Sequence, residues 1–193
     1  MRGIRLSKKG EKGGDVKFER LRVDIRNHLL QRADTFITTM VDYYGLKEWP
    51  EKEKIPAHSA PEKISKTLCN VAYDIIRNDE RLAKAGAESR FVPFVMVHEF
   101  EALLYSDATI LAKAIGISQE LVDKVISECG SPEQVNNSPQ TAPSKRLEHW
   151  SNNHYGKTTM GIKIAQQIGI VRMREHCPLF NQWLKTLEQL VTK

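Results

Sequence analysis

The chain contains 193 residues, of which 40% are hydrophobic and 27% are charged, and its formal net charge is +5. This composition predicts a soluble globular protein of one domain with at most a small appendage. No apolar stretch approaches the roughly 20 residues that cross a bilayer, and the first residues, MRGIRLSKKGEKGG, lack the apolar segment of a signal peptide. We therefore expect a cytoplasmic protein without a membrane partner.

The amino-terminal third predicts a helix followed by a strand. Asp15 is expected to cap a helix whose apolar residues recur at helical spacing, namely Phe18, Leu21, Ile25, Leu29 and Leu30. The segment DTFITTMVDYYG is rich in β-branched and apolar residues, which predicts a strand that ends at Asp42. The proline-containing segment 46–61 predicts an exposed connection.

A helix over 62–77 and a strand over 90–97 follow. Strand, connection with helix, and strand is the order of a parallel crossover, so we expect an α/β fold with a small parallel sheet flanked by helices. The remainder predicts a mostly helical C-terminal half, with helices over 99–105, 107–115, 118–129, 144–150, 157–168, 170–176 and 179–191, several of them ended by Gly116, Gly130 and Gly169. We divide the chain into an α/β core, 1–106, and a helical part packed on it, 107–193.

Acidic residues stand where both predicted strands end. Asp42 closes the first, and His98, Glu99 and Glu101 follow the second in VMVHEFEALLYSD. Because ligands of open α/β sheets bind at strand carboxyl ends, Asp42, Glu99 and Glu101 would form a site for Mg²⁺ or Mn²⁺ if the strands are neighbours. His98 would orient groups or relay a proton, and Glu99 would share the catalytic role.

Structural interpretations of the same residues stay open. Asp42 is also typical of a turn whose amides it caps, and the two glutamates are also typical of a first helical turn, where the helix dipole favours negative charge. Glu99 and Glu101 are two residues apart, so both reach one ion only where the backbone is extended or turning. HEFE does not match the HExxH zinc motif.

The segment TAPSKRLEHW carries a candidate phosphate site. Ser144 is expected to cap a helix, with Lys145 and Arg146 in its first turn beside unpaired backbone amides. A salt bridge from these cations to a carboxylate of the acidic site is an equally good explanation. HYGKTTMG resembles a phosphate loop only weakly, because it lacks the preceding glycine and strand. Cys69, Cys129 and Cys177 are far apart and predict reduced, mostly buried thiols.

Several blocks, in order, resemble the bacterial domain-of-unknown-function family 4276: GGDVKFERLRVDI, TTMVDYYGL, VHEFEALLYSD, NSPQTAPSKRLEHW and IGIVRMREHCPLFNQWLKTLEQL. The resemblance covers nearly the whole chain. It implies a Toprim-like metal-binding α/β fold, with Asp42 at the acidic strand end and Glu99 and Glu101 in the later acidic block. It also implies an ABC-type ATPase partner in antiphage defence.

One departure from that family leaves two functions open. Family members usually open with a strand and a VEGxTE-like turn, and this sequence contains no such motif. The first function is a Mg²⁺- or Mn²⁺-dependent nuclease or phosphodiesterase that acts on nucleic acid with the ATPase. The second is a non-catalytic module that binds and regulates the ATPase. An incomplete sheet would expose an edge for a partner or for a homo-oligomer.

Overall fold

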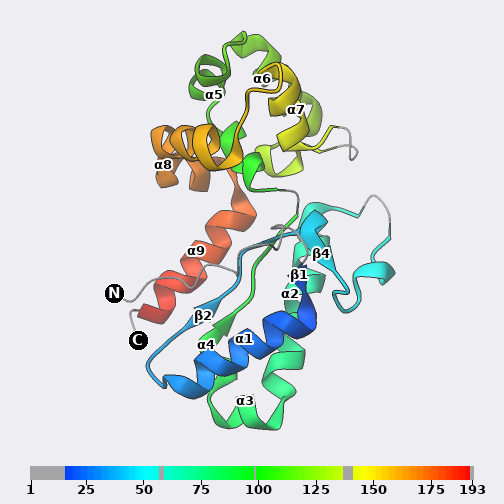
Figure 1. Ribbon diagram of the computed structural model, residues 1–193, viewed down its shortest axis with the longest axis vertical. Coiled ribbons are helices and arrows are strands. Elements are labelled where there is room, and N and C mark those ends of the chain that lie inside the picture. The colour runs from blue at the N-terminus through cyan, green and yellow to red at the C-terminus, as the bar shows by residue number, and fades with distance from the viewer. Residues whose placement is uncertain (1–15, 57–58, 98, 137–140, 192–193) are drawn as a thin grey trace.

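The computed structural model describes residues 16–56, 59–97, 99–136 and 141–191, and it confirms the expected small parallel sheet flanked by helices, with a helical C-terminal half (Figure 1). The helices are α1 (Phe18–Gln31), α2 (Pro61–Asn78), α3 (Glu80–Lys84), α4 (Ala87–Arg90), α5 (Ala108–Ile115), α6 (Gln119–Cys129), α7 (Pro143–Trp150), α8 (Ile162–His176) and α9 (Pro178–Val191). Among the described helices, none combines the length and apolar character needed to span a membrane.

The strands are short and form three parallel pairs. Strand β1 (Val16–Lys17) pairs with β4 (Leu46–Lys47), β2 (Ile37–Thr38) with β5 (Phe91–Val92), and β3 (Val41–Asp42) with β6 (Val95–Met96). Short 3₁₀ helices are η1 (Tyr43–Gly45), η2 (Lys52–Lys54), η3 (Phe100–Ser106) and η4 (Pro132–Gln134), and η5 (Lys157–Gly161) is a π-helical turn. The segment 46–61, predicted to be an exposed connection, contains β4 and η2, and its Leu46 and Trp49 are buried.

The two predicted strands are neighbours, but each is interrupted. Between β2 and β3, the Thr39 hydroxyl accepts the Phe94 amide at 3.0 Å and donates to the Phe94 carbonyl at 3.3 Å. The side chain therefore replaces a regular ladder contact beside Pro93, which has no amide hydrogen to donate. Because the pairs are parallel, β3 and β6 end on the same side, toward the part formed by α5 to α8 (Figure 1).

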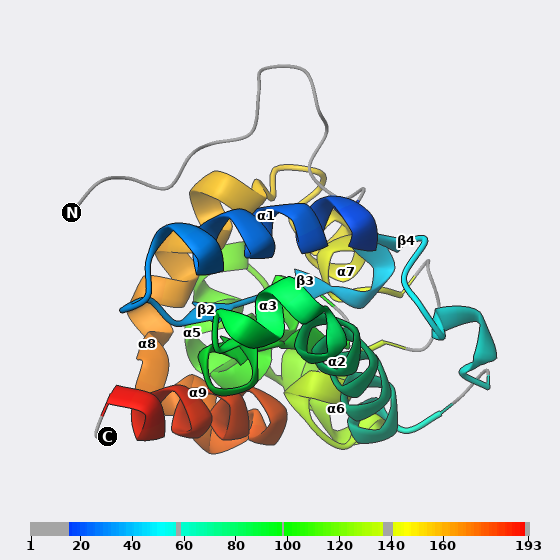
Figure 2. The ribbon, with the colours of Figure 1, turned by 90° about the horizontal axis from the view of Figure 1, so that it is seen from below.

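Helices cover both faces of the central strands. Figure 2 shows α1 on one face and α9 on the other. Ile25 and Leu29 of α1 pack in one buried cluster with Phe91. On the opposite face, Trp183 of α9 stacks on Phe94 with ring centroids 4.8 Å apart. Helix α2 covers the edge of β6, where the Ser65 hydroxyl donates to the Val95 carbonyl at 2.9 Å.

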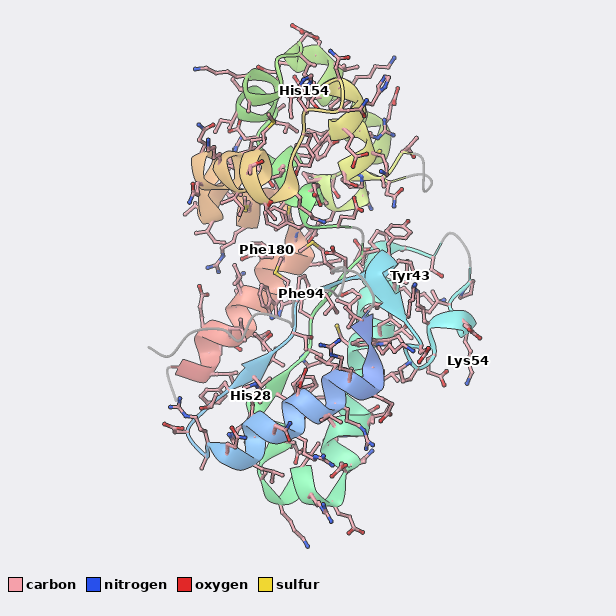
Figure 3. All side chains as sticks on the ribbon, in the orientation of Figure 1. His28, Tyr43, Lys54, Phe94, His154 and Phe180 are labelled. Carbon is pink, nitrogen blue, oxygen red and sulfur yellow. The ribbon has the colours of Figure 1, made fainter. Side chains whose placement is uncertain are left out.

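Helix α9 packs against both the central strands and the part formed by α5 to α8. Phe180 at the start of α9 and Phe94 beside the strands lie close to each other (Figure 3). They lie where α5 to α8, which we call the upper helices, meet the sheet. Both belong to the large buried cluster that also holds side chains of α5, α6 and α8. The predicted division at residue 106 stays a prediction, because α9 contributes to this shared core.

Leu30 and Ser144 differ from their expected places in the helices. Leu30 was expected on the buried face of α1 but is 54% exposed, because the buried face already contains Leu29 and the next residue lies about 100° further around the helix. The proposed cap Asp15 lies outside the described residues. Helix α7 begins at Pro143 after Ala142, so Ser144 is inside the helix and is not its cap.

Candidate acidic site at the strand ends

The carboxylates predicted to meet at the strand ends do lie at one rim. Asp42 is the last residue of β3, and Glu99 and Glu101 follow β6. The backbone at Glu99 is extended, with φ −141° and ψ 162°, and η3 begins at Phe100. This change from extended to helical backbone is the condition under which residues two apart can face the same point. We call Asp42, Glu99 and Glu101 the acidic cluster.

A lysine joins two members of the acidic cluster. The Lys157 ammonium lies 3.0 Å from Glu101 Oε2 and 3.7 Å from Asp42 Oδ2. Lys157 is half exposed, whereas the Glu101 side chain has no exposed surface. One cation therefore compensates two carboxylates that come from different strand ends.

Glu101 is the most buried member of the cluster. Its Oε1 accepts a hydrogen bond from the Tyr155 hydroxyl at 3.3 Å. Its Oε2 has no hydrogen-bond partner of suitable geometry among the described residues, although Lys157 is near, so we treat that contact as an ion pair. A buried acceptor without a directed donor is costly, and such an atom is a candidate ligand for a cation.

Burial raises the pKa of Glu101, and the charge of Glu99 adds to this, while the nearby Lys157 ammonium lowers it. Burial likewise raises the pKa of Asp42 against the opposing charge of Lys157. Burial acts in the opposite direction on Lys157, but Glu101 and Asp42 outweigh it and raise the pKa of the ammonium. The lysine therefore stays charged.

Asp42 does not behave as an ordinary turn residue. Its side chain makes no capping hydrogen bond to the η1 turn that follows it. Its carboxylate instead pairs with Lys157, and the nearby backbone amide of Phe100 acts to lower its pKa. A cavity of about 330 Å³ opens beside it, lined by Val16, Met40, Val41, Asp42, Gly45 and Phe100. The interpretation of Asp42 as a local turn cap was therefore wrong, and the residue lines a cavity.

Glu99 is held by the helix that carries the predicted phosphate residues. Its Oε2 accepts a hydrogen bond of 2.9 Å from the Ser144 backbone amide in the first turn of α7. The predicted unpaired amide at this position is thus used by a carboxylate of the acidic cluster. The contact places the start of α7 beside the acidic cluster.

Lys145 and Arg146 make other contacts. The Lys145 ammonium pairs with Glu148 at 2.7 Å, and Arg146 donates through Nε to the Thr141 carbonyl at 3.0 Å. The alternative that Lys145 forms a salt bridge with the acidic cluster receives no support from these contacts. Their role as a phosphate site stays a prediction. His98 lies outside the described residues.

Lys157 and Tyr155 were missed by the sequence reasoning. Both come from HYGKTTMG, which was treated only as a poor phosphate loop. The signal available was a lysine and a tyrosine close to Gly156 and Gly161. A Cβ at Gly161 would lie 2.6 Å from the Tyr155 hydroxyl, so glycine there lets the tyrosine reach Glu101. The π-helical turn η5 begins at Lys157, and such turns are frequent at functional sites.

The carboxylate oxygens of the acidic cluster are suitable ligands for a divalent cation. Within the described part of the chain, no three carboxylate, imidazole or thiol groups already surround one metal position. Carboxylate oxygens are nevertheless the ligands that Mg²⁺ and Mn²⁺ prefer, and Glu101 Oε2 is a buried acceptor without a directed partner. A larger apolar groove of about 890 Å³, between α2, β5 and α9, contains none of the acidic cluster.

Comparison with known proteins identifies the family of the chain. The sequence model of the family described as a domain of unknown function, DUF4276, matches residues 2–188. No functionally curated protein and no solved structure matches the chain significantly.

Proposed function

Because the chain belongs to the DUF4276 family of unknown function, we propose its activity from the acidic cluster: hydrolysis of phosphodiester bonds, of the nuclease type, with Mg²⁺ or Mn²⁺. One observation carries the proposal. Asp42 from β3 and the buried Glu101 from η3 converge on a single cationic group, beside a cavity large enough for part of a ligand. Carboxylates that follow neighbouring parallel strands are a usual way to hold such an ion.

Each residue has a stated role in this proposal. Asp42, Glu99 and Glu101 would hold the metal, which would neutralise phosphate charge and help to ionise water. The Ser144 amide holds Glu99 through its Oε2, which leaves Oε1 for a metal in this proposal. Lys145 and Arg146, on the same first turn of α7, would contact phosphate oxygens after leaving their present partners. His98, which precedes Glu99 in the chain, would relay a proton.

The wider setting belongs to the same proposal. We infer a Toprim-like relationship and a cytoplasmic role beside an ABC-type ATPase in antiphage defence from the motif resemblance described above. That resemblance is the basis of the setting, and the contacts of the acidic cluster are the basis of the proposed chemistry. If the chain does not bind an ABC-type ATPase, the proposed metal site is not affected and is tested separately.

A specific observation favours a second function, a non-catalytic module that binds and regulates the ATPase. Lys157 already compensates Asp42 and Glu101, so the acidic cluster is stable as a structural ion-pair network without any metal. In that case the carboxylates would maintain the junction between the sheet and the upper helices. The two functions predict different results for the same variants.

Cleavage of DNA and RNA by the full chain, with and without the partner ATPase, tests the first function. With Mg²⁺ or Mn²⁺ we expect cleavage that falls at least about a hundredfold in Asp42→Asn and Glu101→Gln. Asp123→Asn removes an exposed carboxylate of α6 and serves as the charge-matched control. No metal-dependent cleavage by the complex, or unchanged cleavage by Asp42→Asn, removes the hydrolase and leaves the binding module.

A further inference from the structure

Lys157 reaches the acidic cluster from a position that allows it to leave. Its side chain is half exposed, while the carboxylate that it pairs with most closely is fully buried. A lysine ammonium is carried on a flexible four-carbon chain, so it can turn into solvent without movement of the backbone. The lysine can therefore break its ion pairs by rotation of its own side chain, whereas the buried Glu101 carboxylate stays in place.

The ammonium and a divalent ion would compete for the same space. Nζ lies between Glu101 Oε2 and Asp42 Oδ2, at 3.0 and 3.7 Å. An ion such as Mg²⁺ binds carboxylate oxygens at about 2.0–2.1 Å, so one held by both residues would lie in the region that the ammonium fills. The Lys157 ammonium and the metal ion would also repel each other at this short distance. The repulsion is stronger because Glu101 is shielded from water.

We propose that Lys157 is the exchangeable counter-ion of the acidic cluster: its ammonium neutralises Asp42 and Glu101 when no metal is bound and leaves them when a divalent cation binds. This inference rests on the proposed metal site. Lys157 does not line the cavity beside Asp42, and its side chain is already half exposed, so the released ammonium turns into solvent. Metal binding thereby exposes an ammonium group, which is a usual binding group for phosphate.

Calorimetric titration of the metal-free full chain with Mn²⁺ tests the exchange. Lys157→Met removes the competing charge, so we expect it to bind Mn²⁺ about tenfold more tightly than the unsubstituted chain. Lys157→Arg keeps the charge and should bind about as tightly as the unsubstituted chain. Lys113→Met, on the exposed side of α5, makes the same change in net charge away from the acidic cluster and should not alter the affinity.

The outcomes separate the two claims. Equal Mn²⁺ affinity of Lys157→Met and the unsubstituted chain overturns the exchange but leaves the proposed metal site. No Mn²⁺ binding by either protein overturns both. A rise in affinity in Lys157→Met and equally in Lys113→Met reveals a general charge effect and also overturns the exchange.

A second measurement uses the unsubstituted chain and does not depend on the folding of a variant. Amine acylation followed by peptide mass spectrometry reports how accessible each lysine is. We expect acylation of Lys157 to increase severalfold when Mn²⁺ is added, with Lys113 as the internal reference. An unchanged ratio of Lys157 to Lys113 labelling at saturating Mn²⁺ contradicts the exchange.

Discussion

The Lys157 ammonium lies 3.0 Å from Glu101 Oε2, an atom that is buried and has no directed hydrogen bond among the described residues. This relationship joins the upper helices to the ends of the strands. It also explains why a fully buried carboxylate is tolerated, since a buried charge is retained only when a compensating charge or hydrogen bond is close.

Removal of the lysine should destabilise the fold. We expect Lys157→Met to lower the free energy of unfolding by about 1–3 kcal/mol, less than the roughly 3–5 kcal/mol lost when a fully buried pair is broken, because Lys157 is half exposed. The double variant Lys157→Met with Glu101→Gln should recover part of this loss, because both charges are gone. Urea unfolding of the four proteins measures the coupling, and strict additivity would contradict it.

Glu101 should make stability depend on pH. Its pKa is raised above the ordinary value of 4.5 in the folded protein, mainly by burial. Its contribution to stability is therefore fully present below pH 4.5 and is lost as the pH rises through the folded-state pKa. Glu101→Gln should show a smaller decrease in the free energy of unfolding between pH 4.5 and 7. Urea unfolding at several pH values measures this, with Asp123→Asn as the control; identical profiles for Glu101→Gln and the unsubstituted chain would refute the assignment.

Gly161 should tolerate no side chain while Tyr155 keeps its hydroxyl. A Cβ at residue 161 would lie 2.6 Å from that hydroxyl, which donates to Glu101. We expect Gly161→Ala to cost about 1–3 kcal/mol through displacement of the tyrosine. In a Tyr155→Phe background the same substitution should cost less, because the clashing oxygen is absent. Equal costs in both backgrounds, measured by thermal or urea unfolding, would show that the close approach is unimportant.

Glu133 should be needed for the start of α9. Its two carboxylate oxygens accept the amides of Leu179 and Phe180, each at 2.9 Å. Glu133→Ala leaves both amides without this acceptor and should lower the free energy of unfolding by about 1–2 kcal/mol. Glu133→Gln keeps one acceptor oxygen and should lose less. Glu120→Ala, at an exposed position of α6, is expected to stay within about 0.5 kcal/mol.

The acidic cluster could be predicted because each of its residues follows an apolar segment that is recognisable in the sequence. Asp42 closes one apolar segment and Glu101 follows the next, and parallel pairing brings such ends to one side. The extended backbone at Glu99 was stated as a condition for convergence, and the structure satisfies it. Helical apolar spacing predicted α1, and β-branched composition predicted the strand that ends at Asp42, but β1, α3 and α4 were not predicted.

Other features depend on contacts that no local pattern reveals. Lys157 enters the acidic cluster from a π-helical turn that lies far from Asp42 in sequence, and a lone lysine between glycines carries no signal of its ion partner. The interruption between β2 and β3 depends on the Thr39 hydroxyl meeting Phe94 across the pair. Strand β4 was hidden because its partner β1 contributes only two residues.

The most direct test of the metal site is diffraction from crystals soaked in Mn²⁺, with data collected to record its anomalous scattering. The account predicts an anomalous peak bonded to carboxylate oxygens of Asp42 and Glu101, with Glu99 facing it and the Lys157 ammonium moved away. Saturating Mn²⁺ that leaves no peak there, with Lys157 still bridging Asp42 and Glu101, would contradict it.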